Sequence, residues 1–208
     1  MNPTIHNLIF DLGGVLYDLD IEGCLQAFEQ AGLTEVRHLI TGTNEAGIFQ
    51  AYETGELSTP RFREEVRRLI GNPQLTDEDI DRMWNRMLVH LPQEKLDLLH
   101  ELGRHYRLYL LSNTNDLHWE HVVRQAFAKQ GYQVSDFFQQ VFLSFRMKLA
   151  KPNPAIFLTA LENAGLKAEE TLFIDDSPVN CQAAKSVGIQ AVHYTPGEDL
   201  RSLLATVL

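Results

Sequence analysis

The sequence predicts an α/β protein with a Rossmann-like, three-layer core, in which helices cover a parallel sheet, and an inserted α-helical bundle that forms a cap. Strand-like and helix-like segments alternate through the second half of the chain, which is typical of a parallel sheet with helices on both faces. The region from about residue 20 to residue 91 has successive helical patterns and almost no strand signal, which favours a helical bundle. A length of 208 residues suits one such domain with a sizeable insertion.

The first strand is expected in the apolar run of residues 8–16, which carries Asp11 and then the glycine pair Gly13 and Gly14. A short apolar run that is stopped by glycine is typical of a buried strand that ends in a tight turn. In α/β proteins the ends of buried strands face the ligand crevice. We therefore expect Asp11 at the functional site.

Four helices are expected in the region that follows. Three of them are stopped by a glycine, and the fourth starts at a capping box made by Thr76 and Asp79. Their expected ranges are 21–31, 44–53, 60–70 and 76–87.

This succession divides the chain into a core of residues 1–17 and 92–208 and a cap of residues 18–91. An insertion directly after the first strand would lie above the strand ends, where it can act as a lid. Hinges between cap and core are expected near residues 17–20 and 91–93.

Beyond the cap, strands and helices are expected to alternate. The strands are expected at residues 107–111, 140–143, 172–174 and 189–193. The helices are expected at residues 116–130, 154–164 and 178–187. The last helix has clear end signals, because Ser177 suits the N-cap, Pro178 the first helical position and Gly188 the residue beyond the end.

Chemically active side chains follow the ends of these strands. Asp11 follows the first strand, Ser112 the second, and Asp175 with Asp176 the fourth, while Lys151 precedes the helix of residues 154–164. Burying several acids together is costly unless a cation joins them, and Mg²⁺ favours oxygen ligands. Hydrolysis of a phosphate monoester needs a nucleophile, a metal and donors that hold the phosphoryl group, and these residue types match that set.

The four motifs, in this order, resemble those of the haloacid dehalogenase superfamily, whose members are mostly phosphatases. Residues 11–15 (Asp-Leu-Gly-Gly-Val) and 111–115 (Leu-Ser-Asn-Thr-Asn) resemble, more narrowly, a subgroup that includes bacterial glucose-1-phosphatases. The resemblance covers the whole chain, because the helical insertion matches the α-helical cap of the family.

This resemblance implies a role for each motif. Asp11 would attack phosphorus and form an aspartyl-phosphate that water then hydrolyses. Ser112 and the backbone amide of Asn113 would hold phosphoryl oxygens, and Lys151 would bridge the nucleophile and the phosphate. The implied magnesium ligands are the carboxylates of Asp11, Asp175 and Asp176 and the carbonyl of Gly13.

The sequence departs from the family pattern at Gly13. Most phosphatases of the superfamily carry a second aspartate at this position, where it acts as general acid and base. Glycine keeps the carbonyl but offers no proton, which leaves the proton donor open among Asp18, Asp20, Asn115, His118 and water. The loss of a general acid slows catalysis by about 10²–10⁴-fold.

Composition and charge limit which partners and which cellular location are expected for the protein. The formal net charge is −10 and no long Lys/Arg run occurs, so no nucleic-acid partner is expected. No apolar run is long enough for a membrane span, and the first residues lack the pattern of a secretory signal. The cysteines, Cys24 and Cys181, lie far apart, which fits reduced thiols and a cytoplasmic location. No long heptad pattern occurs, and the oligomeric state stays open.

The sequence therefore predicts a magnesium-dependent phosphatase whose substrate is a small phosphorylated metabolite, with a sugar phosphate as the favoured class. Two alternatives stay open. A metal-independent 2-haloacid dehalogenase would also use an aspartate nucleophile, but it would leave Asp175 and Asp176 as idle buried acids. A regulatory phosphate-binding protein that is catalytically weakened would bind phosphometabolites without turnover.

Overall fold

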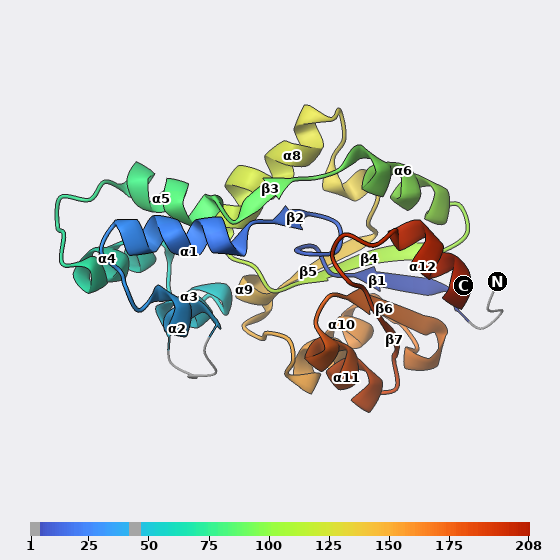
Figure 1. Ribbon diagram of the computed structural model, residues 1–208. Helices are drawn as coiled ribbons and strands as arrows, with labels where there is room; N and C mark the ends of the chain where they lie inside the picture. The colour runs from blue at the N-terminus through green and yellow to red at the C-terminus, as the bar shows by residue number, and fades with distance from the viewer. Residues whose placement is uncertain (1–4, 42–46) are drawn as a thin grey trace.

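The computed structural model describes residues 5–41 and 47–208, and its centre is a parallel sheet of five strands in the order β5-β4-β1-β6-β7 (Figure 1). The strands are β1 (Asn7–Phe10), β4 (Arg107–Ser112), β5 (Gln140–Leu143), β6 (Thr171–Asp175) and β7 (Gln190–His193). This arrangement confirms the expected Rossmann-like α/β core and places each core strand where the sequence predicted it.

Both faces of the sheet are covered because its central strands are apolar on both sides. Leu8 and Phe10 point into one hydrophobic cluster, and Ile9 between them points into another, as the two-residue period of a strand requires. Figure 1 shows helices on the two faces of the sheet. One face carries α6 (Gln93–Leu102), α8 (Arg124–Lys129) and α12 (Leu200–Val207), and the other carries α10 (Pro154–Ala164) and α11 (Pro178–Ser186). The remaining short helical segments of the core are α9 (Ser144–Met147), η2 (Val134–Asp136) and η3 (Ala168–Glu170).

The helix expected over residues 116–130 is present, but it is not a regular α-helix throughout. The segment consists of α7 (Asp116–His118), a π-helical turn η1 (Trp119–Val123) and α8. A π-turn widens the hydrogen-bond step to five residues, which keeps side chains four residues apart near one face. Trp119, Val123 and Phe127 all pack into the same core cluster. The wider turn therefore lets these three side chains enter one cluster, and the helical pattern of the sequence does not indicate it.

The inserted helices form a separate group beside the sheet, on the side away from the two chain ends (Figure 1). They are α1 (Ile21–Gln30), α2 (Val36–Thr41), α3 (Ile48–Glu53), α4 (Thr59–Ile70) and α5 (Asp77–Asn85). Residues 44–46, where the second helix was expected to begin, lie outside the described residues. The group has its own aromatic core, in which Phe62 stacks on Tyr52 at 4.3 Å between ring centroids and lies 5.7 Å from Trp84. Among the described helices, none combines the length and apolarity that crossing a bilayer requires.

The expectation of almost no strand in the inserted region needs a correction. Asp18–Leu19 (β2) and Leu88–His90 (β3) pair as an antiparallel ribbon at the two chain crossings between sheet and helices. Strands of two and three residues are too short to carry an alternating pattern, so no residue pattern indicates them. β2 lies within the first expected hinge range, β3 ends just before the second, and their pairing ties the two crossings together.

Candidate active site

The carboxylates expected at the strand ends come together. Asp11 follows β1 and Asp175 ends β6, and these strands are neighbours in register, with Phe10 opposite Ile174. The backbone N–H of Asp11 donates to the carbonyl of Ile174 at 2.8 Å. Asp11, Asp175 and Asp176 each offer an oxygen, and these oxygens lie within 4.8 Å of one another. We call these three residues the acid cluster.

Lys151 joins the acid cluster from the loop before α10. Its Nζ lies 2.8 Å from Asp11 Oδ1 and 2.7 Å from Asp175 Oδ2, and its side chain is 1% exposed. The side chain of Asn113 holds this loop through two hydrogen bonds to the backbone of Lys151. Asn113 Nδ2 donates to the Lys151 carbonyl and the Lys151 N–H donates to Asn113 Oδ1, both at 2.9 Å. The side chain of Asn113 therefore positions Lys151, a role that the sequence did not predict.

Asp175 is fixed from several directions. Besides Lys151, its carboxylate accepts hydrogen bonds from the N–H of Ser177 at 2.8 Å and from Asn180 Nδ2 at 3.0 Å. Asn180 was not among the expected site residues. Its position in the first turn of the helix that follows the acid pair is the signal that identifies it. Asp176 is only half-buried, whereas Asp175 is fully buried.

The charges of the site fit a divalent cation. Three carboxylates face one ammonium group, which leaves two negative charges in a buried space. Burial, together with nearby Asp175, raises the pKa of Asp11 to about 7 although Lys151 opposes the shift. Burial and the charge of Asp175 also raise the pKa of Asp176. A bound divalent cation would remove this cost, and an all-oxygen donor set suits Mg²⁺.

The residues expected to hold a phosphoryl group lie at the end of β4, next to β1. Ser112 is buried, and its Oγ makes one long hydrogen bond, 3.4 Å to the carbonyl of Asn113. Since the Asn113 side chain is committed to Lys151, its backbone amide is the part that stays available for a ligand. Ser112 and Asn113 thus share the strand-end side of the sheet with Asp11.

The glycine pair after Asp11 is closely surrounded. A Cβ at Gly13 would lie 3.1 Å from Leu19 Cδ1, so Leu19 from β2 occupies the space beside the position where the family pattern has its second aspartate. Gly14 has φ +75°, and a Cβ there would overlap Asp176 Oδ2. The backbone of Gly14 is held by the bond from its N–H to the Tyr17 carbonyl at 2.9 Å.

We expect Gly14→Ala to weaken magnesium binding by about 10- to 100-fold, the range seen when the surroundings of metal ligands are disturbed, because the new methyl group displaces the Asp176 carboxylate. Titration calorimetry with Mg²⁺ measures this change. Gly71→Ala is the matched control, since Gly71 has a nearly equal φ of +72° but no atom within 4 Å of the added Cβ. Equal magnesium affinity in the two variants would contradict the close approach of Gly14 to Asp176.

The acids considered as replacements for the missing aspartate are engaged elsewhere. The side chain of Asp18 is 52% exposed and lies 3.3 Å from His90 Nδ1. Asp20 caps α1 by accepting a hydrogen bond from the N–H of Gly23 at 2.7 Å. Both carboxyl groups therefore have partners outside the acid cluster.

Asn115 and His118 connect the core to the inserted helices. Asn115 Oδ1 accepts from the N–H of His118 at 3.0 Å, and its amide nitrogen donates to His118 Nδ1 at 3.3 Å. His118 Nε2 donates to the Trp84 carbonyl at 3.1 Å, and the two rings stack at 4.7 Å. Burial lowers the pKa of His118 to about 4, so the ring is neutral and both nitrogens are used. These contacts fasten the inserted helices to the sheet and occupy both ring nitrogens of His118.

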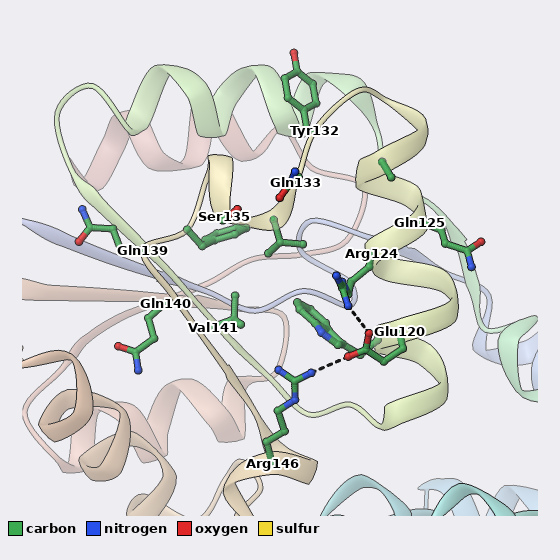
Figure 2. Close-up of a pocket in the computed structure, with 14 residues that line it drawn as sticks. Glu120, Arg124, Gln125, Tyr132, Gln133, Ser135, Gln139, Gln140, Val141 and Arg146 are labelled. Carbon is green, nitrogen blue, oxygen red and sulfur yellow. Dashed lines mark hydrogen bonds and ion pairs between the residues drawn. The ribbon is translucent and has the colours of Figure 1, made fainter.

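A separate groove of about 580 Å³ lies between η1, α8 and β5, and Figure 2 shows the residues that line it. Its lining contains no member of the acid cluster. Its charged residues pair with one another, since Glu120 lies 2.6 Å from Arg124 and 2.7 Å from Arg146 (Figure 2). The two arginines share one glutamate, so the lining keeps one net positive charge.

Comparisons with known proteins agree with this geometry. The profile of the haloacid dehalogenase-like hydrolase family matches residues 5–188. A D-ribitol-5-phosphate phosphatase from Bacteroides thetaiotaomicron is 32% identical over 98% of both chains. A crystal structure of a haloacid dehalogenase family enzyme from the same organism, in complex with magnesium and inorganic phosphate, is similar with 42% identity and a TM-score of 0.89, covering 96% of this chain and 98% of that one. A haloacid dehalogenase-like hydrolase from Porphyromonas gingivalis is similar with 34% identity and a TM-score of 0.89, covering 98% of both chains.

Proposed function

Because the chain belongs to the haloacid dehalogenase-like hydrolase family, we propose that Asp11 is the nucleophile with which it hydrolyses phosphate monoesters. The protein is a magnesium-dependent phosphatase, and a sugar phosphate is its substrate. The observation that carries the assignment of roles is the convergence of Asp11, Asp175 and Asp176 around Lys151 at the strand ends.

The proposed reaction has two steps at Asp11. A carboxylate oxygen of Asp11 attacks phosphorus, the bond to the leaving oxygen breaks, and an aspartyl-phosphate forms. Water then attacks the same phosphorus and returns Asp11 to its free form. Ser112 Oγ and the Asn113 amide would hold phosphoryl oxygens, while Lys151 would balance the charge that develops during transfer.

Asp11, Asp175 and Asp176, with the carbonyl of Gly13, would hold the magnesium ion. When bound, the ion neutralises the phosphoryl oxygens and screens the nucleophile from the substrate charge. Lys151 and Asn180 keep Asp175 in place for this purpose, through bonds of 2.7 and 3.0 Å.

The burial of Asp11, Lys151 and Asp175 supports a small substrate. We propose that residues 18–91 act as a cap over a core made by residues 1–17 and 92–208. The Tyr52 hydroxyl accepts from the N–H of Leu117 at 3.2 Å, which holds the cap against the core. The relative named for D-ribitol-5-phosphate supports a phosphorylated sugar alcohol or sugar of about that size. The two cysteines are free and buried, which supports a reducing cytoplasmic location.

A metal-independent dehalogenase is the weaker candidate. It would require no divalent cation, and the negative charge of the acid cluster would then stay uncompensated. A phosphate-binding regulator without turnover shares the site, so assays of turnover must separate it from the phosphatase.

We expect removal of magnesium to abolish turnover. A panel of phosphate esters that includes ribitol 5-phosphate and p-nitrophenyl phosphate is assayed with excess EDTA and again after Mg²⁺ is restored. Magnesium at 100 times its Kd also raises the free energy of unfolding by about 2.7 kcal/mol, which a thermal melt detects. Turnover that persists in EDTA, or phosphate binding without any turnover, would contradict the proposed function.

A further inference from the structure

Glu53 lies where the cap meets the strand-end loops of the core. It is the last residue of α3, and its carbonyl accepts a hydrogen bond from Ser144 Oγ at 2.6 Å. Ser144 Oγ in turn accepts from the N–H of Thr114 at 2.9 Å, and Thr114 directly follows Ser112 and Asn113. One hydroxyl therefore fixes the backbone of Glu53 to the loop that is placed to hold the phosphoryl group.

The residues that follow Glu53 also pack tightly against the core, at α9. Gly55 has φ +63°, and a Cβ there would overlap the carbonyl of Phe145 in α9. Lys148, at the end of the same helix, donates to the Gly55 carbonyl. These contacts hold the end of α3 in one position relative to the core.

The carboxyl group of Glu53 is not used by any of these contacts. Across residues 5–41 and 47–208, no hydrogen bond or ion pair to it is found, although the residue is partly buried. The charged group that acts on it is Lys151, which also contacts Asp11. A partly buried carboxyl without a partner, within electrostatic reach of Lys151, is costly to keep unless it serves a purpose.

We propose that Glu53 is the general acid and base of this phosphatase, and that the cap thereby supplies the proton-transfer group that position 13 lacks. This inference rests on the phosphatase reaction proposed above. Asp18, Asp20, Asn115 and His118 have other partners, and Leu19 fills the space beside Gly13. Among the residues that the structure describes, Glu53 is the carboxyl outside the acid cluster whose pKa responds to the charge of Lys151.

In the proposed reaction Glu53 gives up a proton in the first step and regains one in the second. When Asp11 attacks phosphorus, the bond to the leaving oxygen breaks and its electron pair stays on that oxygen, which takes the proton from Glu53. The resulting Glu53 carboxylate accepts a proton from the water that attacks the aspartyl-phosphate, and the electron pair of the broken bond returns to Asp11. Glu53 ends the cycle protonated, as it began.

The electrostatics of Glu53 suit this exchange. Burial raises the pKa of Glu53 to about 7, while Lys151 limits the shift. A group with such a pKa is present in both protonation states near neutral pH, which is the condition for efficient acid and base catalysis.

The test compares two leaving groups in Glu53→Gln. With an alkyl phosphate such as ribitol 5-phosphate, the poor leaving group needs the proton, so we expect the single-turnover rate of phosphoryl transfer to fall by about 10²–10⁴-fold. With p-nitrophenyl phosphate the first equivalent of nitrophenolate is expected at nearly the wild-type rate, followed by slow turnover because the second step has lost its base. The ratio of the two single-turnover rates does not depend on how much of the variant is folded.

Glu56→Gln is the matched control, since Glu56 is exposed three residues further along the same segment. It is expected to keep both rates, and calorimetry with Mg²⁺ and inorganic phosphate is expected to show binding in both variants. An equal fall in the two rates of Glu53→Gln, or no fall in either, would overturn the assignment of Glu53. Absence of turnover in the wild-type protein would instead contradict the phosphatase itself.

Discussion

Asp11→Asn is expected to reduce turnover of p-nitrophenyl phosphate by about 10⁴-fold or more, because removal of a covalent nucleophile leaves no comparable route. The same substitution removes one of the buried negative charges of the acid cluster. The melting temperature without magnesium is therefore expected to stay equal or to rise, since less desolvated charge remains in the fold. A steady-state assay and a thermal melt of the same preparation separate the loss of catalysis from any loss of structure.

Asp18→Asn provides the control for this experiment. It makes the same chemical change seven positions further along the chain, at a side chain that is 52% exposed and outside the acid cluster. It is expected to keep wild-type turnover. If Asp11→Asn retained a tenth of the wild-type rate or more, Asp11 would not be the nucleophile.

Lys151→Met is expected to lower both stability and catalysis. The lysine is the positive partner of two buried carboxylates, at 2.8 Å from Asp11 and 2.7 Å from Asp175. Breaking such a buried pair typically costs about 3–5 kcal/mol in free energy of unfolding, because an uncompensated charge stays behind. Loss of a charge-stabilising donor is expected to lower kcat by a further factor of about 10²–10³.

Magnesium distinguishes the two consequences of Lys151→Met. Urea denaturation with and without saturating Mg²⁺ is expected to show that the ion restores part of the lost stability, since it binds the folded acid cluster, while kcat stays low. Lys185→Met, at an exposed lysine on α11, is expected to change stability by no more than about 0.5 kcal/mol. Unchanged stability of Lys151→Met without magnesium would contradict a charge-compensating role for the lysine.

The site itself was predictable to a large extent, because strand ends are local features. The apolar runs that end at Asp11 and at Asp175 place both carboxylates at the same edge of a parallel sheet once the strands pair. The sequence could not reveal how Lys151 is held. The bonds between Asn113 and Lys151 join residues 38 positions apart, and no local pattern encodes them.

The missing aspartate illustrates the same limit more sharply. Gly13 offers no proton, and the sequence leaves several replacements open. The structure removes His118 from that set, since stacking on Trp84 and two hydrogen bonds occupy its ring. The structure indicates Glu53 instead, because Ser144, which is 91 positions away in the chain, holds its backbone at the strand-end loops.

The sequence by itself determined the α/β class, the core strands and the identity of the acid cluster, because hydrophobic periodicity and glycine stops act over a few residues. The tertiary structure decided the π-turn of Trp119–Val123, the ribbon of β2 and β3, the filling of space by Leu19 and the position of Glu53. Each of these depends on which distant side chains share one volume. The packing of the whole chain determines which distant side chains come together, and the spacing of residues along the sequence does not specify it.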